Sequence, residues 1–335
     1  MSRKPTMEDV KNLAGVSIST VSRVINGTRR VSPEKTEAVK RAIEKLGYKP
    51  NELARSLVMK RSNTLGIILD DVGYGYMAQY LRGIDEIGKM YKYDILLYST
   101  FGDFETQKNA VEFLSSKQVE GIIVISEKIN NEVLYLIKEH DIPYLLLDSY
   151  YNTDDYKTIT IDYHSAASEI TNYVIENNHK NIAFLRERSS SFASDTKENG
   201  YIDTIKKAGL RTNISYVNSD SIESGYEFMK ENLDILRESN ITAIIASSDN
   251  LAIGILHYCY DNDILIPEEF SITGFGNSDI TALYRPALTT VRLPYYDIGA
   301  VGVRMLIKVI KEEGSLDESL SLHHEVIKRQ TVKKI

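Results

Sequence analysis

Two short helical patterns separated by a glycine turn, close to the amino terminus, restrict the fold of this chain more than any other feature. Thr6 is followed three positions later by an acidic residue, Asp9. This spacing is typical of a capping box, in which two side chains satisfy free backbone amides at a helix start. Val10, Leu13 and Ala14 then follow helical spacing. The pattern predicts a first helix that begins after Thr6 and carries these three residues on its apolar face.

A second helix is predicted directly after the first. Gly15 provides the backbone freedom that a tight turn needs, and Ser17 is a suitable N-cap for residues 18–25. Within this segment Val21 and Val24 lie on the inner side, while small polar residues lie on the outer side. The two helices and their turn form a helix-turn-helix unit.

A third helix is expected to close a small three-helix core. Ser32 is a candidate N-cap and Pro33 occupies the first helical position, where proline is favoured. The helical pattern continues over residues 36–46 and ends at Gly47, a residue typical of helix ends.

The segment after the third helix is a candidate hinge. Pro50 interrupts the chain, and residues 51–57 are too short to form a stable helix alone in water. We expect them to be helical only when bound. Physical reasoning supports two interpretations of Leu57 equally: a wedge pressed between base steps of the minor groove, or a linker residue that packs on its neighbour.

Charge is distributed unevenly along the chain. Residues 1–61 contain 14 Lys and Arg against 6 Asp and Glu, a net charge of +8. The whole chain is −7, so the remaining residues carry −15. A basic segment on an acidic protein is the electrostatic pattern expected of a module that binds double-stranded DNA.

Composition limits the class of protein. The chain has 335 residues, of which 42% are hydrophobic and 26% charged, values that are ordinary for a globular protein of two or three units. No apolar run approaches the roughly 18 residues of a membrane span, and the amino terminus lacks an apolar signal core. We therefore expect a cytoplasmic protein with no membrane partner. The single cysteine, Cys259, is expected to be a buried structural residue.

The rest of the chain alternates apolar strand patterns with helical ones. Four nearly continuous apolar runs predict strands of a sheet that is covered on both faces, each followed by a helix, and a second set repeats this rhythm. We therefore predict two doubly wound α/β lobes with a ligand cleft between them. The predicted strands are 64–69, 93–98, 119–124 and 142–147 in the first lobe, and 181–185, 214–217, 242–246 and 271–274 in the second.

Several motifs resemble those of one bacterial family. Residues 14–17, 20–24, 26–27, 47–51 and 54–57, and further on 121–123, 248–254, 274–276 and 285–291, are similar to the lactose-repressor (LacI/GalR) family of transcriptional regulators. The resemblance implies a homodimer that binds a pseudopalindromic operator in double-stranded DNA. It also implies a helix-turn-helix domain at 1–49, a hinge helix at 50–61 and a two-lobe, periplasmic-binding-protein-like core at 62–335. The first lobe would comprise about 62–162 and 292–322, and the second about 163–290 and 323–335, with crossings near Asp162, Val291 and His323.

The resemblance also assigns DNA contacts. The start of the second helix would lie in the major groove, where Arg23 is the strongest candidate because a guanidinium can bond both acceptors of a guanine. Each polar candidate could instead be an ordinary cap or a solvated group. The predicted base-reading residues are Ile18, Ser19 and Arg23; the phosphate-positioning residues are Thr6, Ser17, Thr20, Ser22 and Asn26; the minor-groove residues are Asn51, Ala54, Arg55 and Leu57.

The cleft departs from the sugar-responsive members of this family. Gly276 stands where many relatives have an aspartate, Ser149 stands where an arginine is common, and residues 195–200 replace an arginine-rich stretch. These losses weaken the case for a tightly bound sugar inducer. The candidate cleft residues are Asp148, Ser149, Asp249 and Asn277, and a sugar phosphate is a further candidate ligand.

Residues 295–308 and 89–93 resemble the carbon-catabolite-control subgroup of the family, whose corepressor is the phosphocarrier HPr phosphorylated on a serine. Arg304 and Lys308 lie four positions apart, so the two cations share a helix face and repel each other. A phosphoserine would relieve that repulsion. Spacing alone favours a solvated basic face, and the resemblance favours docking. The predicted phosphocarrier contacts are Tyr91, Tyr296, Asp297, Arg304 and Lys308.

Two functions follow from these patterns. The first is a regulator, mainly a repressor, of carbon catabolite control; the alternative is a local repressor of sugar utilisation that a sugar or sugar phosphate releases. Catalysis is not expected, because Ser194-x-x-Lys197 and the Ser-Asp-Asn at 248–250 occur in reversed order without the Lys-Thr-Gly of β-lactamases. The six histidines show no metal-ligand spacing, and no cofactor is expected.

Overall fold

The computed structural model describes residues 5–26, 30–48, 62–73, 75–126, 129–148, 158–313 and 320–335. The predicted hinge, with Asn51, Ala54, Arg55 and Leu57, lies outside the described residues, and so does Ser149. Among the helices that are described, none is both long enough and apolar enough to cross a membrane.

Three helices form the amino-terminal domain: α1 (Met7–Ala14), α2 (Ile18–Asn26) and α3 (Pro33–Leu46). The predicted capping box at Thr6 is confirmed, and the Thr6 backbone amide donates to the Asp9 carboxylate at 2.8 Å. Gly15 and Gly47 end α1 and α3 in the left-handed conformation, with φ of 64° and 60°. The prediction that the Ser32 side chain caps α3 is wrong. Its carbonyl, not its hydroxyl, accepts a hydrogen bond, from the amide of Thr36 at 3.0 Å.

The core of this domain is small. Met7, Val10 and Ala14 form the inward stripe of α1, and Leu13 lies about 90° away from that stripe. Leu13 is 45% exposed, so its predicted position on the apolar face is wrong. The fully buried hydrophobic side chains are Val10, Val21, Val39 and Ala42.

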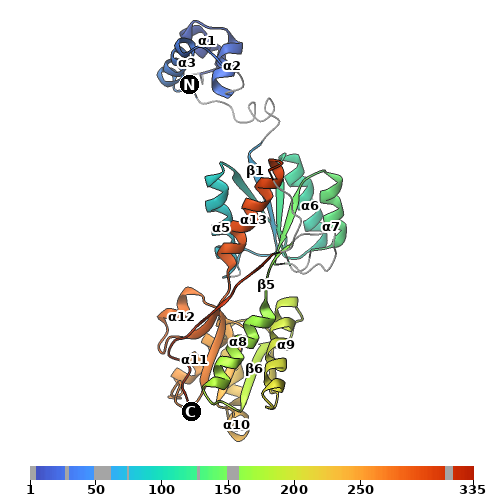
Figure 1. The fold of residues 1–335 in the computed structure, drawn as a ribbon, viewed down its shortest axis with the longest axis vertical. Helices are drawn as coiled ribbons and strands as arrows, with labels where there is room; N and C mark the ends of the chain where they lie inside the picture. Colours follow the sequence, from blue (N-terminus) through green and yellow to red (C-terminus); the bar gives the residue numbers. More distant parts are fainter. Residues whose placement is uncertain are drawn as a thin grey trace.

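The first lobe is a parallel sheet between two pairs of helices (Figure 1). Helices α5 (Met77–Met90) and α13 (Tyr295–Ile310) cover one face, and α6 (Phe104–Ser116) and α7 (Asn131–Glu139) cover the other. The strand order is β11-β5-β4-β3-β1-β2. The strands are β1 (Thr64–Leu69), β2 (Asp94–Ser99), β3 (Gly121–Ile125), β4 (Tyr144–Leu147), β5 (Thr158–Ile161) and β11 (Leu320–Leu322).

The second lobe repeats this plan with the order β12-β10-β9-β8-β6-β7, in which only β12 runs antiparallel to its neighbour. Its strands are β6 (Ile182–Glu187), β7 (Ile214–Val217), β8 (Ala243–Ala246), β9 (Ser271–Gly276), β10 (Thr289–Arg292) and β12 (Glu325–Ile327). Its helices are α8 (Tyr163–Glu176), α9 (Phe192–Lys207), α10 (Ile222–Glu238), α11 (Asp249–Asp261) and α12 (Asp279–Leu283). The predicted pair of doubly wound lobes is confirmed.

Strand burial follows position in the sheet. β1 has a neighbour on each side and is almost completely buried, whereas β2 is an edge strand and none of its residues is buried. The prediction of a fully covered strand at 93–98 is therefore wrong in its burial. The helix expected after β4 would fall on residues 149–157, which lie outside the described part. Cys259 is buried on α11, as predicted.

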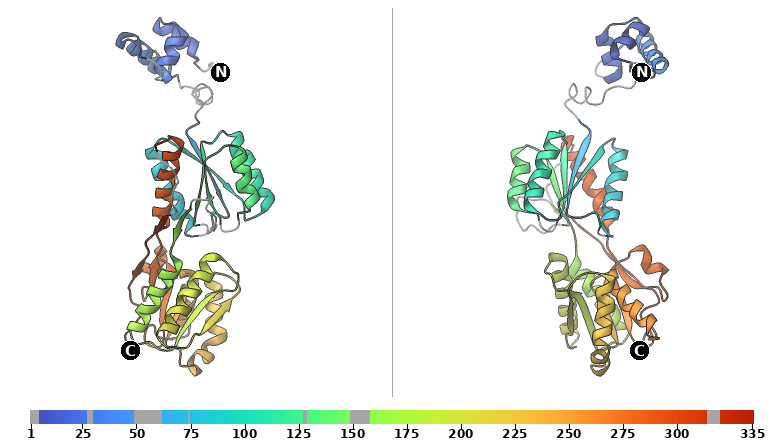
Figure 2. Two further views of the ribbon diagram at one scale, coloured as in Figure 1. Left: turned by 45° about the vertical axis from the view of Figure 1, so that its right-hand side comes forward. Right: turned by 180° about the vertical axis from the view of Figure 1, so that it is seen from behind.

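The chain passes between the two sheets three times. It leaves β5 at Ile161 and enters α8, whose N-cap Asp162 accepts from the amide of Ser165 at 2.9 Å. It returns between β10 and α13, and crosses again between β11 and β12. These three segments lie side by side at the waist of the core (Figure 2).

Candidate functional site

The exposed face of α2 carries the three residues predicted to read bases. Val21 is fully buried and fixes the inward side of the helix. Ile18 is 48% exposed, and Ser19 and Arg23 are also exposed. At about 100° per residue, the arc from Ile18 to Arg23 spans about 140°. Arg23 has no ion-pair partner within the described residues, so its guanidinium is available to an acceptor on DNA.

Hydroxyl groups surround the start of α2. The Ser17 hydroxyl lies 2.8 Å from the hydroxyls of both Ser19 and Thr20, and it accepts from the Thr20 amide at 3.2 Å. This cap confirms the predicted helix start, and the side chains of Ser17 and Ser19 are exposed there. Ser22 is half-buried, and Asn26 ends the helix with a side chain outside the described part.

Thr6 is engaged by its own helix. Its hydroxyl donates to the Asp9 carboxylate at 2.7 Å, and its amide donates to the same oxygen. A phosphate contact through either donor would break one of these bonds. The arrangement therefore favours a capping role for Thr6 over the predicted phosphate contact.

Helices α5 and α13 pack backbone against backbone. A Cβ atom on Gly83 would lie 2.2 Å from the carbonyl oxygen of Tyr296, and one on Gly299 would lie 2.4 Å from the carbonyl oxygen of Tyr80. Neither position admits a side chain without separation of the helices. The two helices consequently lie side by side on one face of the first lobe (Figure 2).

The residues predicted to contact a phosphocarrier gather on this surface. The Tyr296 hydroxyl donates to Glu86 of α5 at 2.7 Å, and the ammonium of Lys311 lies 5.2 Å from the centre of the Tyr91 ring. The side chains of Asp297, Arg304 and Lys308 are exposed, whereas those of Tyr91 and Tyr296 are half-buried.

The cations on the two helices differ in their partners. On α5, Arg82 pairs with Glu86 at 2.9 Å, and Lys89 pairs with an aspartate one turn earlier at 2.6 Å. Hydrogen bonds from Arg82 and Tyr296 hold the pKa of Glu86 below its usual range. On α13, by contrast, no carboxylate among the residues that the structure describes forms an ion pair with Arg304 or Lys308.

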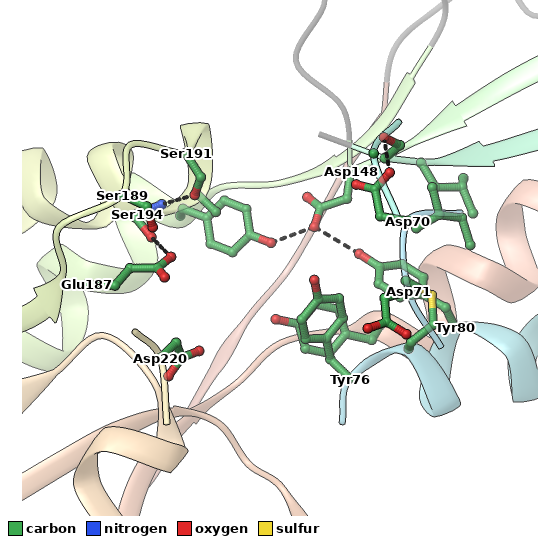
Figure 3. A pocket seen from close by; sticks show the side chains of 18 of the residues that line it. Asp70, Asp71, Tyr76, Tyr80, Asp148, Glu187, Ser189, Ser191, Ser194 and Asp220 are labelled. Atoms are coloured by element: carbon green, nitrogen blue, oxygen red, sulfur yellow. Dashed lines mark hydrogen bonds between the residues drawn. The ribbon is translucent and has the colours of Figure 1, made fainter. Parts of the chain in front are cut away.

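A cavity of about 390 Å³ lies between the two lobes (Figure 3). Residues at or just beyond the carboxyl ends of strands in both sheets line it, as the fold predicts. The charged part of its described lining is mainly acidic and consists of Asp70, Asp71, Asp148, Glu187, Lys197 and Asp220.

Asp148 projects into this cavity (Figure 3). One carboxylate oxygen, Oδ2, accepts from the hydroxyls of Tyr80 at 2.9 Å and Tyr163 at 2.6 Å. The other, Oδ1, is buried without a hydrogen-bond partner among the described residues. Burial raises the pKa of the Asp148 carboxyl, while the two tyrosine hydrogen bonds act in the opposite direction.

Asp249 and Asn277 do not line the cavity between the lobes. The Asp249 carboxylate accepts from the Thr290 hydroxyl at 2.6 Å and from the Ser278 amide at 2.7 Å, and its burial raises its pKa. Asn277 accepts from Arg329 at 2.6 Å. Of the four predicted cleft residues, only Asp148 therefore reaches this cavity in the described part.

The Asp249 carboxylate also explains why residue 276 is a glycine. Gly276 has a φ of 129°, which side chains rarely adopt, and a Cβ there would lie 3.0 Å from Oδ2 of Asp249. An aspartate at this position would be strained and would face a second carboxylate. The departure from the sugar-responsive pattern thus has a local structural cause.

Sequence reasoning missed the aromatic part of the cavity. The ring centres of Tyr76 and Tyr80 each lie 5.1 Å from that of Tyr295. The acidic residues could have been predicted from the sequence, because Asp70 and Asp148 directly follow strands. The tyrosines belong to helix starts on either side of the waist, and no spacing in the sequence marks them.

A second cavity, of about 590 Å³, lies beside the segments that cross between the lobes. Its lining includes Tyr296 and Asp297 at the start of α13, His323 and His324 of one crossing, and Asn277. The first turn of α13 therefore borders the part of the chain that joins the lobes. Within the described residues, no group of three or more His, Cys, Asp or Glu could hold a metal ion.

Comparisons with known proteins agree with this architecture. Residues 6–51 match the model of bacterial regulatory proteins of the lacI family, and residues 171–332 match the periplasmic binding protein-like domain. The chain is 34% identical over 333 residues to catabolite control protein A of Priestia megaterium, an alignment that covers 98% of this chain and 99% of that relative.

Solved structures share the fold over most or all of the chain. A lac repressor dimer bound to operator and the anti-inducer ONPF has a TM-score of 0.85 at 22% identity, covering 99% of this chain and all of that one. The transcription regulator CcpA of Lactococcus lactis has a TM-score of 0.69 at 30% identity, covering 81% of this chain and 99% of that one.

Proposed function

This chain belongs to the lacI family of bacterial regulatory proteins and is a DNA-binding transcriptional regulator, and we propose that it acts in carbon catabolite control. In this proposal, serine-phosphorylated HPr docks on α5 and α13 and strengthens operator binding. The observation that carries the proposal is the pair of exposed cations Arg304 and Lys308 on α13, which have no ion-pair partner within the described part of the chain. The name of the Priestia megaterium relative supports it.

The chemistry of the pair suits a phosphoserine. A phosphoserine brings a charge of about −1.5 to −2 and three acceptor oxygens, and charge-assisted hydrogen bonds to such oxygens are about twice as strong as neutral ones. Arg304 and Lys308 lie one turn apart on α13, so a single phosphate can reach both. Tyr91, Tyr296 and Asp297 would contact the body of the phosphocarrier.

On the DNA side, the proposal assigns α2 to the major groove. Arg23 would bond the two acceptors of a guanine, and Ile18 would make an apolar contact such as one with a thymine methyl. Ser17 and Thr20 would bind phosphates. A homodimer would present two such helices to a pseudopalindromic operator.

Docking and DNA binding would be coupled through the waist. Helix α13 begins at the crossing segments and runs toward the end of the lobe where β1 begins (Figure 1). A partner bound along it would favour the lobe arrangement that it fits best, and it can shift the equilibrium only by its differential affinity for the two states. We expect a coupling of about 1 to 3 kcal/mol.

A local repressor released by a sugar or sugar phosphate is the second candidate. The cavity between the lobes supports it, because residues from both lobes line it and a bound ligand would alter their closure. A thermal-shift titration of the protein alone separates the candidates. A cavity ligand raises the melting temperature without any partner protein.

Calorimetric titration of the full chain with HPr, in its serine-phosphorylated and unphosphorylated forms, tests the docking proposal. We expect binding of the phosphorylated form only, and its loss in the double variant Arg304→Ala/Lys308→Ala. Lys108→Ala, which removes a cation from α6 on the opposite face of the same sheet, is the matched control. Equal binding of both forms of HPr, or undiminished binding by the double variant, would contradict the proposal.

A further inference from the structure

We propose that the cavity between the lobes binds a small organic cation that carries ammonium groups. This inference goes beyond the proposed function, because it concerns a small ligand and does not require a phosphocarrier. The cavity volume of about 390 Å³ lies at the lower end of the range of about 300 to 1,000 Å³ that is usual for small-molecule sites. The ligand is therefore a small molecule.

The charge of the cavity wall favours a ligand that carries a positive charge. Five carboxylates and one cation line the cavity among the described residues. The cation, Lys197, already donates to the carbonyl of Ser247 at 3.1 Å and lies 5.2 Å from the rings of Tyr163 and Phe275. A phosphate-bearing ligand would meet an excess of like charge in a partly desolvated site. An ammonium group would meet several opposite charges.

Asp148 places a carboxylate beside the tyrosine side chains of the cavity wall. Tyr80 and Tyr163 both donate to Oδ2, whereas Oδ1 is buried without a partner among the described residues. An ammonium N–H is the strongest available type of donor to a carboxylate, because both partners are charged.

Aromatic rings complete the site. Tyr76 and Tyr295 stack with their ring centres 5.1 Å apart, and Tyr80 packs beside Tyr295. The negative faces of such rings attract cations. Ser189 and Ser191, from the second lobe, also line the cavity and can bond hydroxyl groups or ammonium protons. Rings and carboxylates together favour a cation over a neutral sugar, which would leave the excess negative charge uncompensated.

Probes that share one ring and differ in charge test this inference. We would titrate the full chain, without DNA or HPr, by calorimetry at pH 6.5 with glucosamine, glucose and glucose 6-phosphate, and with putrescine as an ammonium compound without a ring. At least one ammonium probe is expected to bind tenfold or more tightly than glucose, with glucose 6-phosphate weakest. Comparison of glucosamine with putrescine tells whether the ammonium is presented on a ring or on a linear chain. Tighter binding of glucose or glucose 6-phosphate, or no binding of either ammonium probe, overturns the proposal.

Variants locate the binding. Asp148→Asn preserves the shape of the side chain and removes its charge. It is expected to weaken binding of the ammonium probe at least tenfold. Because the Asp148 carboxylate also holds the hydroxyls of Tyr80 and Tyr163, Asp71→Asn serves as a second variant, with a smaller loss expected. Glu176→Gln removes a carboxylate from the far end of α8, about 20 Å from its first residue, and should change nothing. Unchanged affinity in both wall variants would place the ligand elsewhere and reject the site. Failure here would leave the HPr titration unaffected, so the two proposals fail separately.

Discussion

Helices α2 and α13 both expose an arginine on a solvent-facing surface, but they pack against cores of very different size. Helix α2 belongs to a small domain in which four of the described hydrophobic residues are buried. Helix α13 packs on a six-stranded sheet and lies backbone to backbone against α5, through the contacts at Gly83 and Gly299.

The comparison shows on which helix a substitution can change binding affinity without changing the stability of the protein. The position of α13 is fixed by contacts that do not involve its exposed side chains, so changes at Arg304 or Lys308 should alter affinity without altering stability. The position of α2 depends on a small core and on the caps of short helices. In that domain, changes far from the DNA-facing surface should also matter.

The largest effect should come from Arg23→Lys, which keeps the charge of the α2 face and removes its bidentate geometry. We expect a loss of about 1 to 3 kcal/mol at each half-site of a dimer, with little change in binding to a scrambled sequence. Fluorescence anisotropy at one fixed salt concentration measures both. Arg41→Lys, an exposed site on α3 that pairs with Glu37, is the control. Equal losses on operator and scrambled DNA would show that Arg23 contacts phosphate rather than a base.

Next in size is the double variant Arg304→Ala/Lys308→Ala on α13. It should lose the whole response of operator binding to serine-phosphorylated HPr, about 1 to 3 kcal/mol, and retain basal operator binding. Because both side chains are exposed, its melting temperature should stay close to that of the parent. A large fall in melting temperature would contradict the claim that the exposed side chains of α13 do not contribute to stability.

Thr6→Ala removes one side of the capping box of α1 and should destabilise the amino-terminal domain by about 0.5 to 2 kcal/mol. Amide hydrogen exchange should become faster in α1 and remain unchanged in α13. Ser32→Ala is the matched control, since that hydroxyl makes no capping bond to α3. Similar exchange in the two variants would count against the role of the capping box.

The smallest effect should be that of Leu13→Gln. Leu13 is 45% exposed, so the free energy of unfolding should change by no more than about 0.5 kcal/mol. Val10→Ala, at a fully buried position of the same helix, should cost more than about 1 kcal/mol. Chemical denaturation of the two variants compares them, and a larger cost for Leu13→Gln would mean that its surface packs on something in solution.

The sequence predicted those helices, turns and strands that depend on interactions between residues close together in the chain. The capping box at Thr6, the turn at Gly15 and the strand over 64–69 can be read from short patterns, because caps, turns and apolar runs act over a few residues. The burial of β2 could not, since an edge strand and a central strand can share the same apolar run. Leu13 was misplaced for a similar reason: helical spacing allows two stripes, and the packing of α3 selects one.

The candidate sites divide in the same way. The exposed cations of α2 and α13 could be identified because a helix face follows directly from spacing. The cavity could not be assembled from sequence, since its tyrosines come from the starts of three helices, α5, α8 and α13, that are far apart along the chain. Asp249 illustrates the opposite error, because its motif suggested a ligand contact and its carboxylate is bonded within the second lobe.

The central claim is that a phosphoserine on α13 strengthens DNA binding by α2. The most direct test is an anisotropy titration of this protein on a labelled pseudopalindromic catabolite-type operator, with serine-phosphorylated HPr, with unphosphorylated HPr and with neither, at a single salt concentration. Tightening of about 5- to 150-fold with the phosphorylated form alone is the predicted result. Identical affinity under all three conditions would contradict the claim and favour control by a ligand in the cavity between the lobes.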